Sequence, residues 1–137
     1  MQQRVIAPSE LIINADGTIF HLHLKPEQLA DTVILVGDPA RVATIAAHFD
    51  SVECNVSNRE FNTVTGYYKG KRMSVISTGI GIGNIDICVT ELDALANVDF
   101  ATRMVKDTFR RLTLVRLGTS GALQEDIEVG EVVFART

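Results

Sequence analysis

Three arginines and three glycine turns are the groups in this sequence best suited to bind an anion. Guanidinium groups hold phosphate through paired hydrogen bonds, and the backbone N–H groups of glycine turns attract the same charge. Arg41 follows the first turn, Arg59 precedes a predicted strand, and Arg116 precedes the third turn. The turns are Val36-Gly-Asp-Pro39, Thr78-Gly-Ile-Gly-Ile-Gly83 and Leu117-Gly-Thr-Ser-Gly121. The combination predicts a site for a small oxyanion.

Each of these groups also has a purely structural interpretation. Arg116 lies in the apolar run Leu114-Val-Arg-Leu117, where a charge is costly unless it has a partner, so the alternative is a buried ion pair. Arg41 could instead be a solvated helix residue, and Arg59 taken alone is better explained as a solvated side chain. A single glycine turn needs no ligand, because glycine simply permits a positive φ. Three such turns at strand ends favour the anion site.

Several common ligand-binding and catalytic motifs are absent. Gly79-x-Gly81-x-Gly83 lacks the G-x-G-x-x-G spacing of dinucleotide-binding folds, and no lysine follows the glycines as in a P-loop. The third turn is not the G-x-S-x-G turn of serine hydrolases, and no histidine follows it. His21 and His23 alternate as in a strand, but a metal site would need a third ligand that the sequence does not suggest. We therefore expect no metal.

The composition argues against other classes of protein. The 137 residues include 13 basic and 17 acidic side chains, and the resulting charge of −4 argues against a nucleic-acid partner. No apolar run approaches the roughly 20 residues that cross a membrane, and the N-terminus lacks the apolar stretch of a signal peptide. Two cysteines, Cys54 and Cys88, cannot form a disulfide framework, so a reducing cytoplasm is the simplest location. Cys88 is expected to be a small core residue.

The elements that must position the arginines alternate between strands and helices. Stripes with a 3.6-residue period predict one helix that begins at Pro39 and another that follows the second glycine turn. The stripes are Val42, Ile45, Ala46 and Phe49, then Ile85, Val89, Leu92 and Leu95. Residues 1–16 are expected to form an irregular arm, and 99–111 to be helical or irregular. Strands are predicted at residues 32–36, 63–68, 72–76, 113–117 and 129–135.

This order of elements predicts an α/β fold with a mixed central sheet flanked by helices, all in one domain. Three of the predicted strands end in the glycine turns. Ligands of α/β sheets gather at the carboxyl ends of strands, so the three turns are expected to form one shallow bowl of backbone N–H groups.

The same residues carry a resemblance to a known family. The chain resembles the N-terminal half of the uridine phosphorylases, within the nucleoside phosphorylase family, in five pieces that occur in the same order over residues 20–135. The resemblance implies that residues 1–137 are the N-terminal part of a single, larger domain and that the chain stops within the fold. The matching pieces are Phe20-His21-Leu22, Val36-Gly-Asp-Pro-Ala-Arg-Val42, Asn58-Arg-Glu-Phe61, Ser77-Thr-Gly-Ile-Gly81 and Val115-Arg-Leu-Gly-Thr-Ser-Gly-Ala122.

The resemblance implies phosphorolysis, in which a nucleoside and phosphate give a free base and ribose 1-phosphate. Arg116 and Thr119 would be catalytic, and both would hold phosphate together with Gly37 and Arg41. Arg59 would contact phosphate, and His21 the ribose 5′-hydroxyl, each from a neighbouring subunit. Thr119 would also reach the ribose, and Ser120 and Gly121 would lie against the base.

The resemblance also implies the partners and the absence of a resident cofactor. The partners would be a nucleoside, phosphate and further copies of the chain, as dimers assembled up to a hexamer. Some bacterial relatives hold a potassium ion between subunits, partly through the glutamate that matches Glu60, but Asn84 replaces a serine of those relatives and argues against the ion. Pyrimidine is expected because purine relatives usually carry Ser-Cys in place of Thr119-Ser120. The alternatives are a purine phosphorylase, a nucleoside hydrolase and a non-catalytic nucleoside- or phosphate-binding module.

Residues outside this chain bear on its expected activity. In relatives, the pocket for the base and a Met-Glu segment that binds the ribose hydroxyls lie in the second half of the fold. We therefore expect the 137-residue chain alone to bind phosphate weakly and to cleave nucleosides poorly or not at all.

Overall fold

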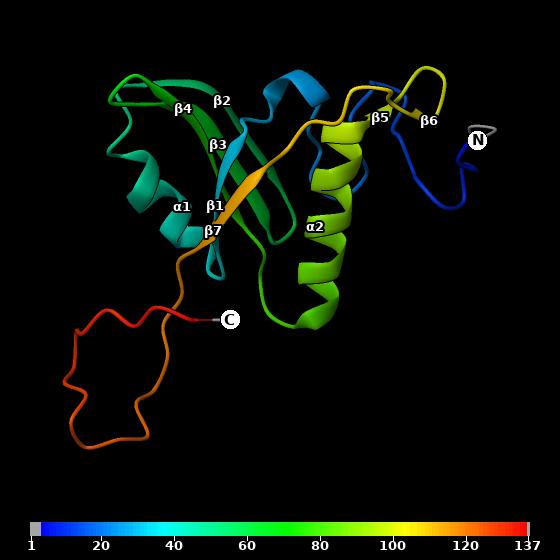
Figure 1. The fold of residues 1–137 in the computed structure, drawn as a ribbon. Helices are drawn as coiled ribbons and strands as arrows, with labels where there is room; N and C mark the ends of the chain where they lie inside the picture. The colour runs from blue at the N-terminus through cyan, green and yellow to red at the C-terminus, as the bar shows by residue number, and fades with distance from the viewer. Residues whose placement is uncertain (1–3, 137) are drawn as a thin grey trace.

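A five-stranded sheet lies between two helices in the computed structural model, which describes residues 4–136 (Figure 1). The fold class predicted from the sequence, a mixed sheet flanked by helices, is confirmed. A separate two-stranded hairpin joins β5 (Val98–Asp99) and β6 (Met104–Val105). The strands of the main sheet are β1 (Thr32–Val36), β2 (Ser51–Asn58), β3 (Phe61–Tyr68), β4 (Lys71–Ser77) and β7 (Thr113–Arg116), and the helices are α1 (Pro39–Ala46) and α2 (Ile82–Asn97).

The order of the sheet brings the glycine turns together. Its strands run in the order β2-β3-β4-β1-β7, and β1 is parallel to both β4 and β7. Val36 at the end of β1 pairs with Ser77 at the end of β4, and Leu35 pairs with Arg116 at the end of β7. The carboxyl ends of the three parallel strands therefore share one edge, and the three turns begin side by side.

β1 and α1 form one continuous unit that fixes Arg41. Successive strand side chains point to opposite faces, so Val33 and Leu35 pack into the core under α2 while Val36 packs under α1. Pro39 occupies the first helical position of α1, and the Asp38 carboxylate accepts a hydrogen bond from the Ala40 N–H at 2.9 Å. This cap holds Arg41 in the first turn of the helix, next to the end of β1.

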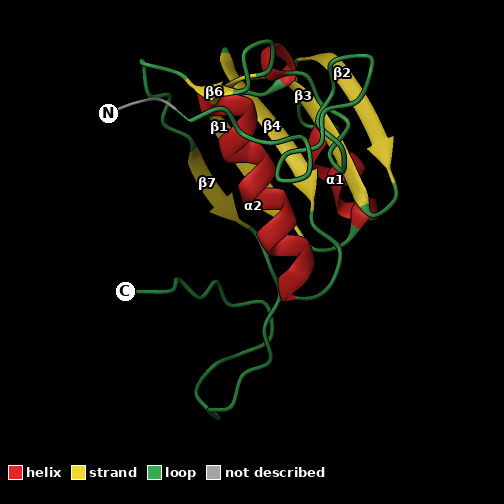
Figure 2. Ribbon diagram, turned by 90° about the vertical axis from the view of Figure 1, so that its right-hand side faces the viewer, coloured by secondary structure: helices red, strands yellow, loops and turns green. Residues whose placement is uncertain are grey.

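α2 lies across the opposite face of the sheet (Figure 2). Its buried side begins at Cys88 and continues through Leu92 and Leu95, which belong to the larger apolar core. The predicted stripe is correct for Leu92 and Leu95 but wrong for Ile85 and Val89, which are 38% and 40% exposed. The first turns of α2 extend past the strands that bury its later turns (Figure 1), so apolar periodicity there has no facing surface.

The edges of the sheet are where the structure departs most from the sequence-based prediction. β2 was not predicted, because its sequence is mostly polar and its side chains stay exposed or half-buried at the edge next to β3. The hairpin of β5 and β6 replaces part of the predicted helical or irregular stretch. The predicted strand at 129–135 is wrong, because no strand forms there and its side chains lie in solvent. A strand needs a hydrogen-bonded neighbour, and this segment extends away from the sheet (Figure 1).

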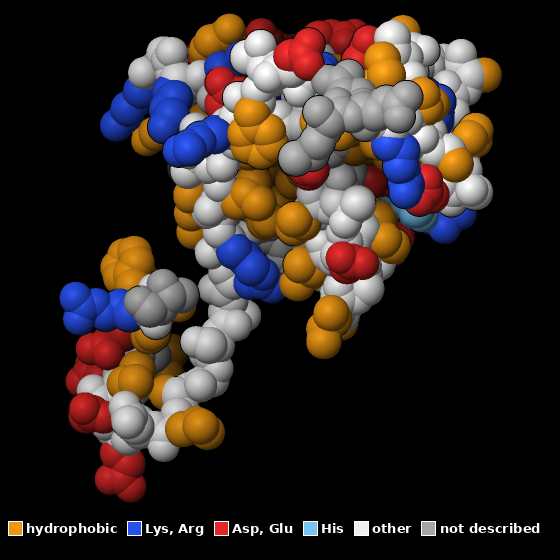
Figure 3. All heavy atoms as spheres, turned by 45° about the vertical axis from the view of Figure 1, so that its right-hand side comes forward, with side chains coloured by type: hydrophobic (Ala, Val, Ile, Leu, Met, Phe, Trp, Pro, Cys, Tyr) orange, Lys and Arg blue, Asp and Glu red, His pale blue; other side chains and the backbone are white. Residues whose placement is uncertain are grey.

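β7 lies at the opposite edge of the sheet from β2, and all four of its residues are exposed. An apolar patch continues from β7 onto α2, on the face seen in Figure 3. The patch consists of Val89, Phe109 and Leu114, which line one hollow and are each at least 40% exposed.

The segment before β1 is tied to the body by hydrogen bonds rather than by regular structure. Arg103 donates from Nε to the Ile6 carbonyl at 2.8 Å and from Nη2 to the carbonyls of Ala7 and Leu11. The Ile6 N–H in turn donates to the Arg103 carbonyl at 2.8 Å. His21 and His23 lie at a turn rather than in the predicted strand, and His23 has a φ of 54°. Within residues 4–136, no helix combines the length and the apolar character needed to cross a bilayer.

Candidate functional site

A cleft of about 740 Å³ opens at the shared carboxyl edge of the parallel strands. Its walls come from the turn after β1, the start of α1, the turn after β4, the start of α2 and the end of β7. This is the place where the sequence predicted the bowl. The lining residues are Gly37, Asp38, Pro39, Arg41, Glu60, Gly79, Ile80, Gly81, Asn84, Ile85 and Arg116.

Arg41 and Arg116 converge on Gly37 from two different elements. A Cβ atom placed on Gly37 would lie 3.5 Å from Nη2 of Arg41 and 3.8 Å from Nη2 of Arg116. Nη1 of Arg41 also donates a long hydrogen bond of 3.5 Å to the Leu117 carbonyl, which links α1 to the end of β7. Two guanidinium groups within 4 Å of one point make a binding position for a doubly charged oxyanion.

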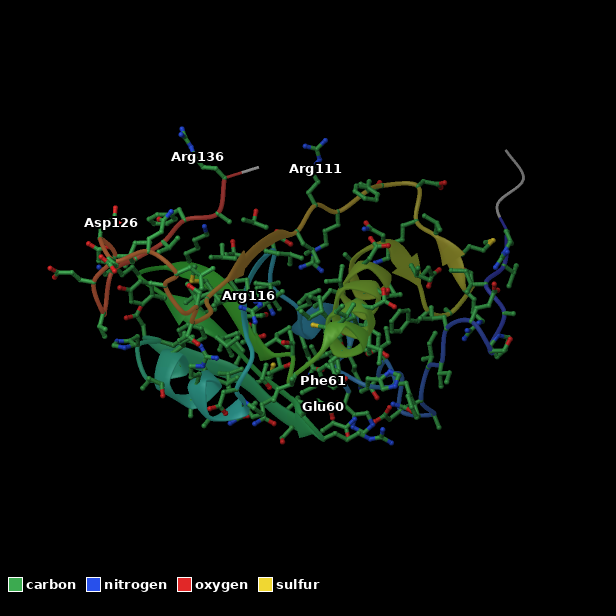
Figure 4. All side chains as sticks on the ribbon, turned by 90° about the horizontal axis from the view of Figure 1, so that it is seen from below. Glu60, Phe61, Arg111, Arg116, Asp126 and Arg136 are labelled. Atoms are coloured by element: carbon green, nitrogen blue, oxygen red, sulfur yellow. The ribbon has the colours of Figure 1, made fainter. Side chains whose placement is uncertain are left out.

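The alternative interpretation of Arg116 as part of a buried ion pair is wrong. Arg116 is exposed and forms no ion pair within residues 4–136. The apolar residues around it suggested burial, but β7 is an edge strand, so the run is exposed. Figure 4 shows Arg116 between neighbouring elements, whereas Arg111 and Arg136 extend away from the ribbon.

The turn after β4 is shaped by a close contact at Gly79. Its φ is 67°, and an added Cβ would lie 2.9 Å from Nδ2 of Asn84 and 3.0 Å from Cβ and Cγ of Glu60. Glu60 is held by Ser77, whose hydroxyl donates to the Glu60 carbonyl at 2.6 Å and accepts from the Asn62 N–H at 2.8 Å. Glycine at position 79 therefore lets Glu60 and Asn84 approach the same turn.

Fewer backbone N–H groups are free at the cleft than the three turns suggested. The Thr78 N–H donates to the Val36 carbonyl at 2.8 Å, and the Leu117 N–H donates to the Leu35 carbonyl at 2.9 Å. Pro39 has no N–H, and the carboxylates of Asp38 and Glu60 lie at the same cleft as the two arginines. Attraction of an anion therefore depends mainly on Arg41 and Arg116.

His21 lies at a second hollow, of about 190 Å³, where it is held on two sides. Its Nδ1 is 2.7 Å from Oε1 of Glu91, and the same carboxylate accepts the N–H of His21 at 3.0 Å and that of Leu22 at 2.8 Å. Nδ2 of Asn58 donates to the His21 carbonyl at 2.8 Å. We call these contacts of His21 with Glu91 and Asn58 the His21 clamp.

Sequence reasoning did not identify Glu91, although a signal for it was present. Glu91 is 7% exposed and occupies the buried side of α2, one turn after Cys88. A carboxylate in an otherwise apolar stripe is the kind of costly charge that drew attention to Arg116. Cys88 is fully buried as predicted, and burial, with a smaller effect of the Glu91 charge, raises the pKa of its thiol to about 12.

The remaining predicted site residues lie away from the strand-end cleft. Arg59 is exposed in the turn between β2 and β3, with a φ of 54°. Thr119 is exposed in the extended segment after β7, and Ser120 and Gly121 line a different hollow formed by residues 120–133. The structure thus brings Gly37, Arg41 and Arg116 together and leaves the predicted roles of Arg59, Thr119, Ser120, Gly121 and His21 as predictions.

The chain is similar in sequence to curated nucleoside phosphorylases of two kinds. Uridine phosphorylase of Thermococcus kodakarensis is 37% identical over 121 residues, covering 88% of this chain and 39% of that protein. Purine nucleoside phosphorylase DeoD-type of Thermoanaerobacter sp. strain X514 is 39% identical over 116 residues, covering 84% and 44%. The chain therefore spans about two fifths of the length of these curated relatives.

A solved structure gives the same result for the fold. The crystal structure of the Trypanosoma brucei nucleoside phosphorylase, described as showing uridine phosphorylase activity, matches with a TM-score of 0.79 and 36% identity, covering 86% of this chain and 41% of that one. The family model described as "Phosphorylase superfamily" matches residues 31–137, which include all of the main sheet, both helices and the strand-end cleft. This chain belongs to the phosphorylase superfamily.

Proposed function

We propose that this chain supplies the phosphate-binding part of a nucleoside phosphorylase. The observation that carries the proposal is the convergence of Arg41 and Arg116 on Gly37 at the carboxyl edge of the parallel strands. A phosphate ion between the two guanidinium groups would receive charge-assisted hydrogen bonds from both. Membership of the phosphorylase superfamily supports phosphate as the anion.

In the proposed reaction, phosphate displaces the base from the ribose. The glycosidic C–N bond breaks, its electron pair stays on the base nitrogen, and a phosphate oxygen forms the new bond to the anomeric carbon. The two arginines hold the phosphate next to the developing positive charge on the ribose, so positioning and electrostatics lower the barrier. The reaction involves no oxidation or reduction, and phosphate is the co-substrate.

The finer parts of the proposal concern the base, the other residues and the assembly. We favour uridine, because Thr119-Ser120 stands where purine relatives usually carry Ser-Cys. A purine nucleoside is the second candidate, because relatives of both kinds match at 37% and 39% identity. Thr119 would hold phosphate and ribose, Ser120 and Gly121 the base, and Arg59 and His21 would act on a neighbouring copy. We place the protein in the cytoplasm, where Cys54 and Cys88 stay as free thiols.

The first experiment measures phosphate binding by the 137-residue chain in equilibrium dialysis with radiolabelled phosphate. Arg116→Gln should weaken binding at least tenfold, because one of the two guanidinium groups is lost. Arg111→Gln is the matched control, since it removes the same charge from a side chain that extends away from the body (Figure 4). Equal affinity of the Arg116→Gln and unsubstituted chains would reject the site.

The second experiment separates the three classes of function. Release of base from uridine and from inosine is followed by chromatography with and without phosphate. A phosphorylase releases base in proportion to phosphate and yields ribose 1-phosphate, whereas a hydrolase releases it without phosphate. If the chain binds phosphate but releases no base, even after the rest of a relative's fold is added as a separate polypeptide, a binding module is favoured instead.

A further inference from the structure

The His21 clamp leaves one ring nitrogen of His21 unused. Glu91 is nearly buried, and its carboxylate receives the N–H groups of His21 and Leu22 as well as the contact with Nδ1. No contact to Nε2 of His21 is formed within residues 4–136. Thr63 Oγ1 is the single buried side-chain nitrogen or oxygen without a hydrogen bond in that range, so Nε2 is not buried and reaches solvent.

The partners of Glu91 determine which nitrogen carries the proton. Both oxygens of the Glu91 carboxylate already accept backbone N–H groups, from His21 and Leu22, and a carboxylate oxygen in this arrangement acts as an acceptor. Nδ1 must therefore be the donor in the 2.7 Å contact, which leaves Nε2 of the neutral ring as an acceptor. The ring cannot turn freely, because Phe20 packs edge-on against it at 4.8 Å and the Asn58 amide holds the His21 carbonyl.

We propose that Glu91 is a positioning residue that sets the tautomer of His21, so that Nε2 presents a hydrogen-bond acceptor to a hydroxyl group of the ligand. The hollow beside His21 is lined partly by Phe20, Ile87 and Thr90, so a hydroxyl on a largely apolar or sugar-like body fits it. The identification of that hydroxyl as a ribose hydroxyl rests on the proposed function. The tautomer itself is independent of the reaction that the protein catalyses.

The test is nitrogen NMR of the 137-residue chain labelled with ¹⁵N-histidine, in alkaline solution where the spectrum no longer changes with pH. The chain has three histidines, and His23 and His48 are exposed internal references. His21 should show a protonated, pyrrole-type Nδ1 and a pyridine-type Nε2. A pyridine-type Nδ1 in the unsubstituted chain overturns the proposal without any variant being needed.

Two variants distinguish a tautomer effect from a merely structural one. Glu91→Gln keeps the shape of the side chain but offers an amide N–H₂ to Nδ1. Nδ1 should therefore become pyridine-type and Nε2 pyrrole-type. Asp93→Asn is the matched control, because Asp93 is on the same helix and its carboxylate accepts a hydrogen bond from the Asn97 amide at 2.8 Å. An unchanged His21 spectrum in folded Glu91→Gln overturns the proposal, as does an exchange in Asp93→Asn.

The ligand part is tested with uridine and 5′-deoxyuridine as probes at millimolar concentration. Uridine should shift the Nε2 signal of His21, and both 5′-deoxyuridine with the unsubstituted chain and uridine with Glu91→Gln should lose at least four fifths of that shift. Equal shifts with the two probes, or no shift with uridine, overturn the assignment of Nε2 to a ribose hydroxyl. Phosphate binding at Arg116 can succeed or fail independently of these results, so the proposed function and this inference are tested separately.

Discussion

The strand-end cleft and the His21 clamp hold charged side chains in opposite ways. In the cleft, Arg116 is exposed and has no ion-pair partner among the residues that the structure describes. In the clamp, Glu91 is nearly buried and receives three N–H groups at 2.7–3.0 Å. The Arg116 guanidinium is available to bind a ligand, whereas the Glu91 carboxylate is fully used in hydrogen bonds that stabilise the fold. Substitutions of the two cleft arginines should therefore change phosphate binding with little change in stability, whereas substitutions of Glu91 should also change stability.

The largest expected difference concerns Cys88, which lies on the same buried side of α2 as Glu91. Burial raises the pKa of its thiol to about 12, so very little reactive thiolate exists near neutral pH, whereas Cys54 is half-buried on β2. We expect iodoacetamide to modify Cys54 about 1,000-fold faster than Cys88 in the folded chain, as followed by mass spectrometry. Similar rates for both cysteines without denaturant would show that this side of α2 is open.

The same raised pKa predicts a loss of stability in alkaline solution. A group whose pKa is higher in the folded state stabilises the fold fully below its ordinary value, here 9.0, and this contribution is lost as the pH rises to about 12. Urea unfolding at increasing pH should show a decrease across this window that is smaller in Cys88→Ala. A decrease of equal size in Cys88→Ala would assign the effect to other groups.

Glu91→Ala should destabilise the chain by about 3 kcal/mol in urea unfolding, because the buried N–H of Leu22 and the two half-buried N–H groups of His21 lose their acceptor. Asp93→Ala is the control, since Asp93 is exposed and accepts one hydrogen bond from Asn97, and we expect a loss below about 1 kcal/mol. Phosphate affinity should stay within twofold in both variants while they are folded. A stable Glu91→Ala chain would mean that the clamp does not contribute to the fold.

Gly79→Ala tests the cleft side of the comparison, because Gly79 lines the cleft and lies close to Glu60 and Asn84. The added Cβ would lie 2.9 Å from Asn84 at a φ of 67°, so we expect a loss of about 2 kcal/mol together with weaker phosphate binding. Gly83→Ala is the matched control, since nothing lies within 4 Å and the residue is helical, and it should gain up to about 1 kcal/mol. If Gly83→Ala destabilised the chain by the same amount, the close contacts at position 79 would not be the cause of the loss.

Arg41→Gln has the smallest expected effect on stability and sharpens the comparison within the cleft. Arg41 is half-buried and donates one long bond to the Leu117 carbonyl, so the loss should be below about 1 kcal/mol. Phosphate affinity should fall about tenfold, which corresponds to about 1.4 kcal/mol. Dialysis and urea unfolding on the same preparation check both values, and a large loss of stability with unchanged binding would reverse the assignment.

The sequence predicted the part of the site that depends on local signals. The apolar run of β1, the Asp38-Pro39 helix start and the paired glycine turns placed Gly37 and Arg41 correctly, because each of these signals acts within a few residues. The strand order then brought Arg116 to the same cleft. The prediction that Arg116 is buried was wrong, because an apolar run has the same sequence pattern at the edge of a sheet as in its centre.

Other errors share that cause. Residues 129–135 have the composition of a strand but no neighbouring strand to bond with, and β2 forms from polar residues because β3 lies beside it. Ile85 and Val89 continue the apolar period of α2 where no sheet faces them. In each case the local sequence pattern alone was misleading, and the presence or absence of a neighbouring strand or a facing sheet decided the structure.

The amino-acid sequence by itself determined the fold class, the sites of chain reversal and the types of side chain available for an oxyanion, because short-range periodicity, glycine and proline act locally. Only the tertiary structure decided which charges are free and which are satisfied. Glu91 meets His21 across 70 positions of the chain, and Arg41 and Arg116 meet at Gly37 from separate elements. Such meetings depend on strand order and on the packing of α2, and no local pattern specifies them.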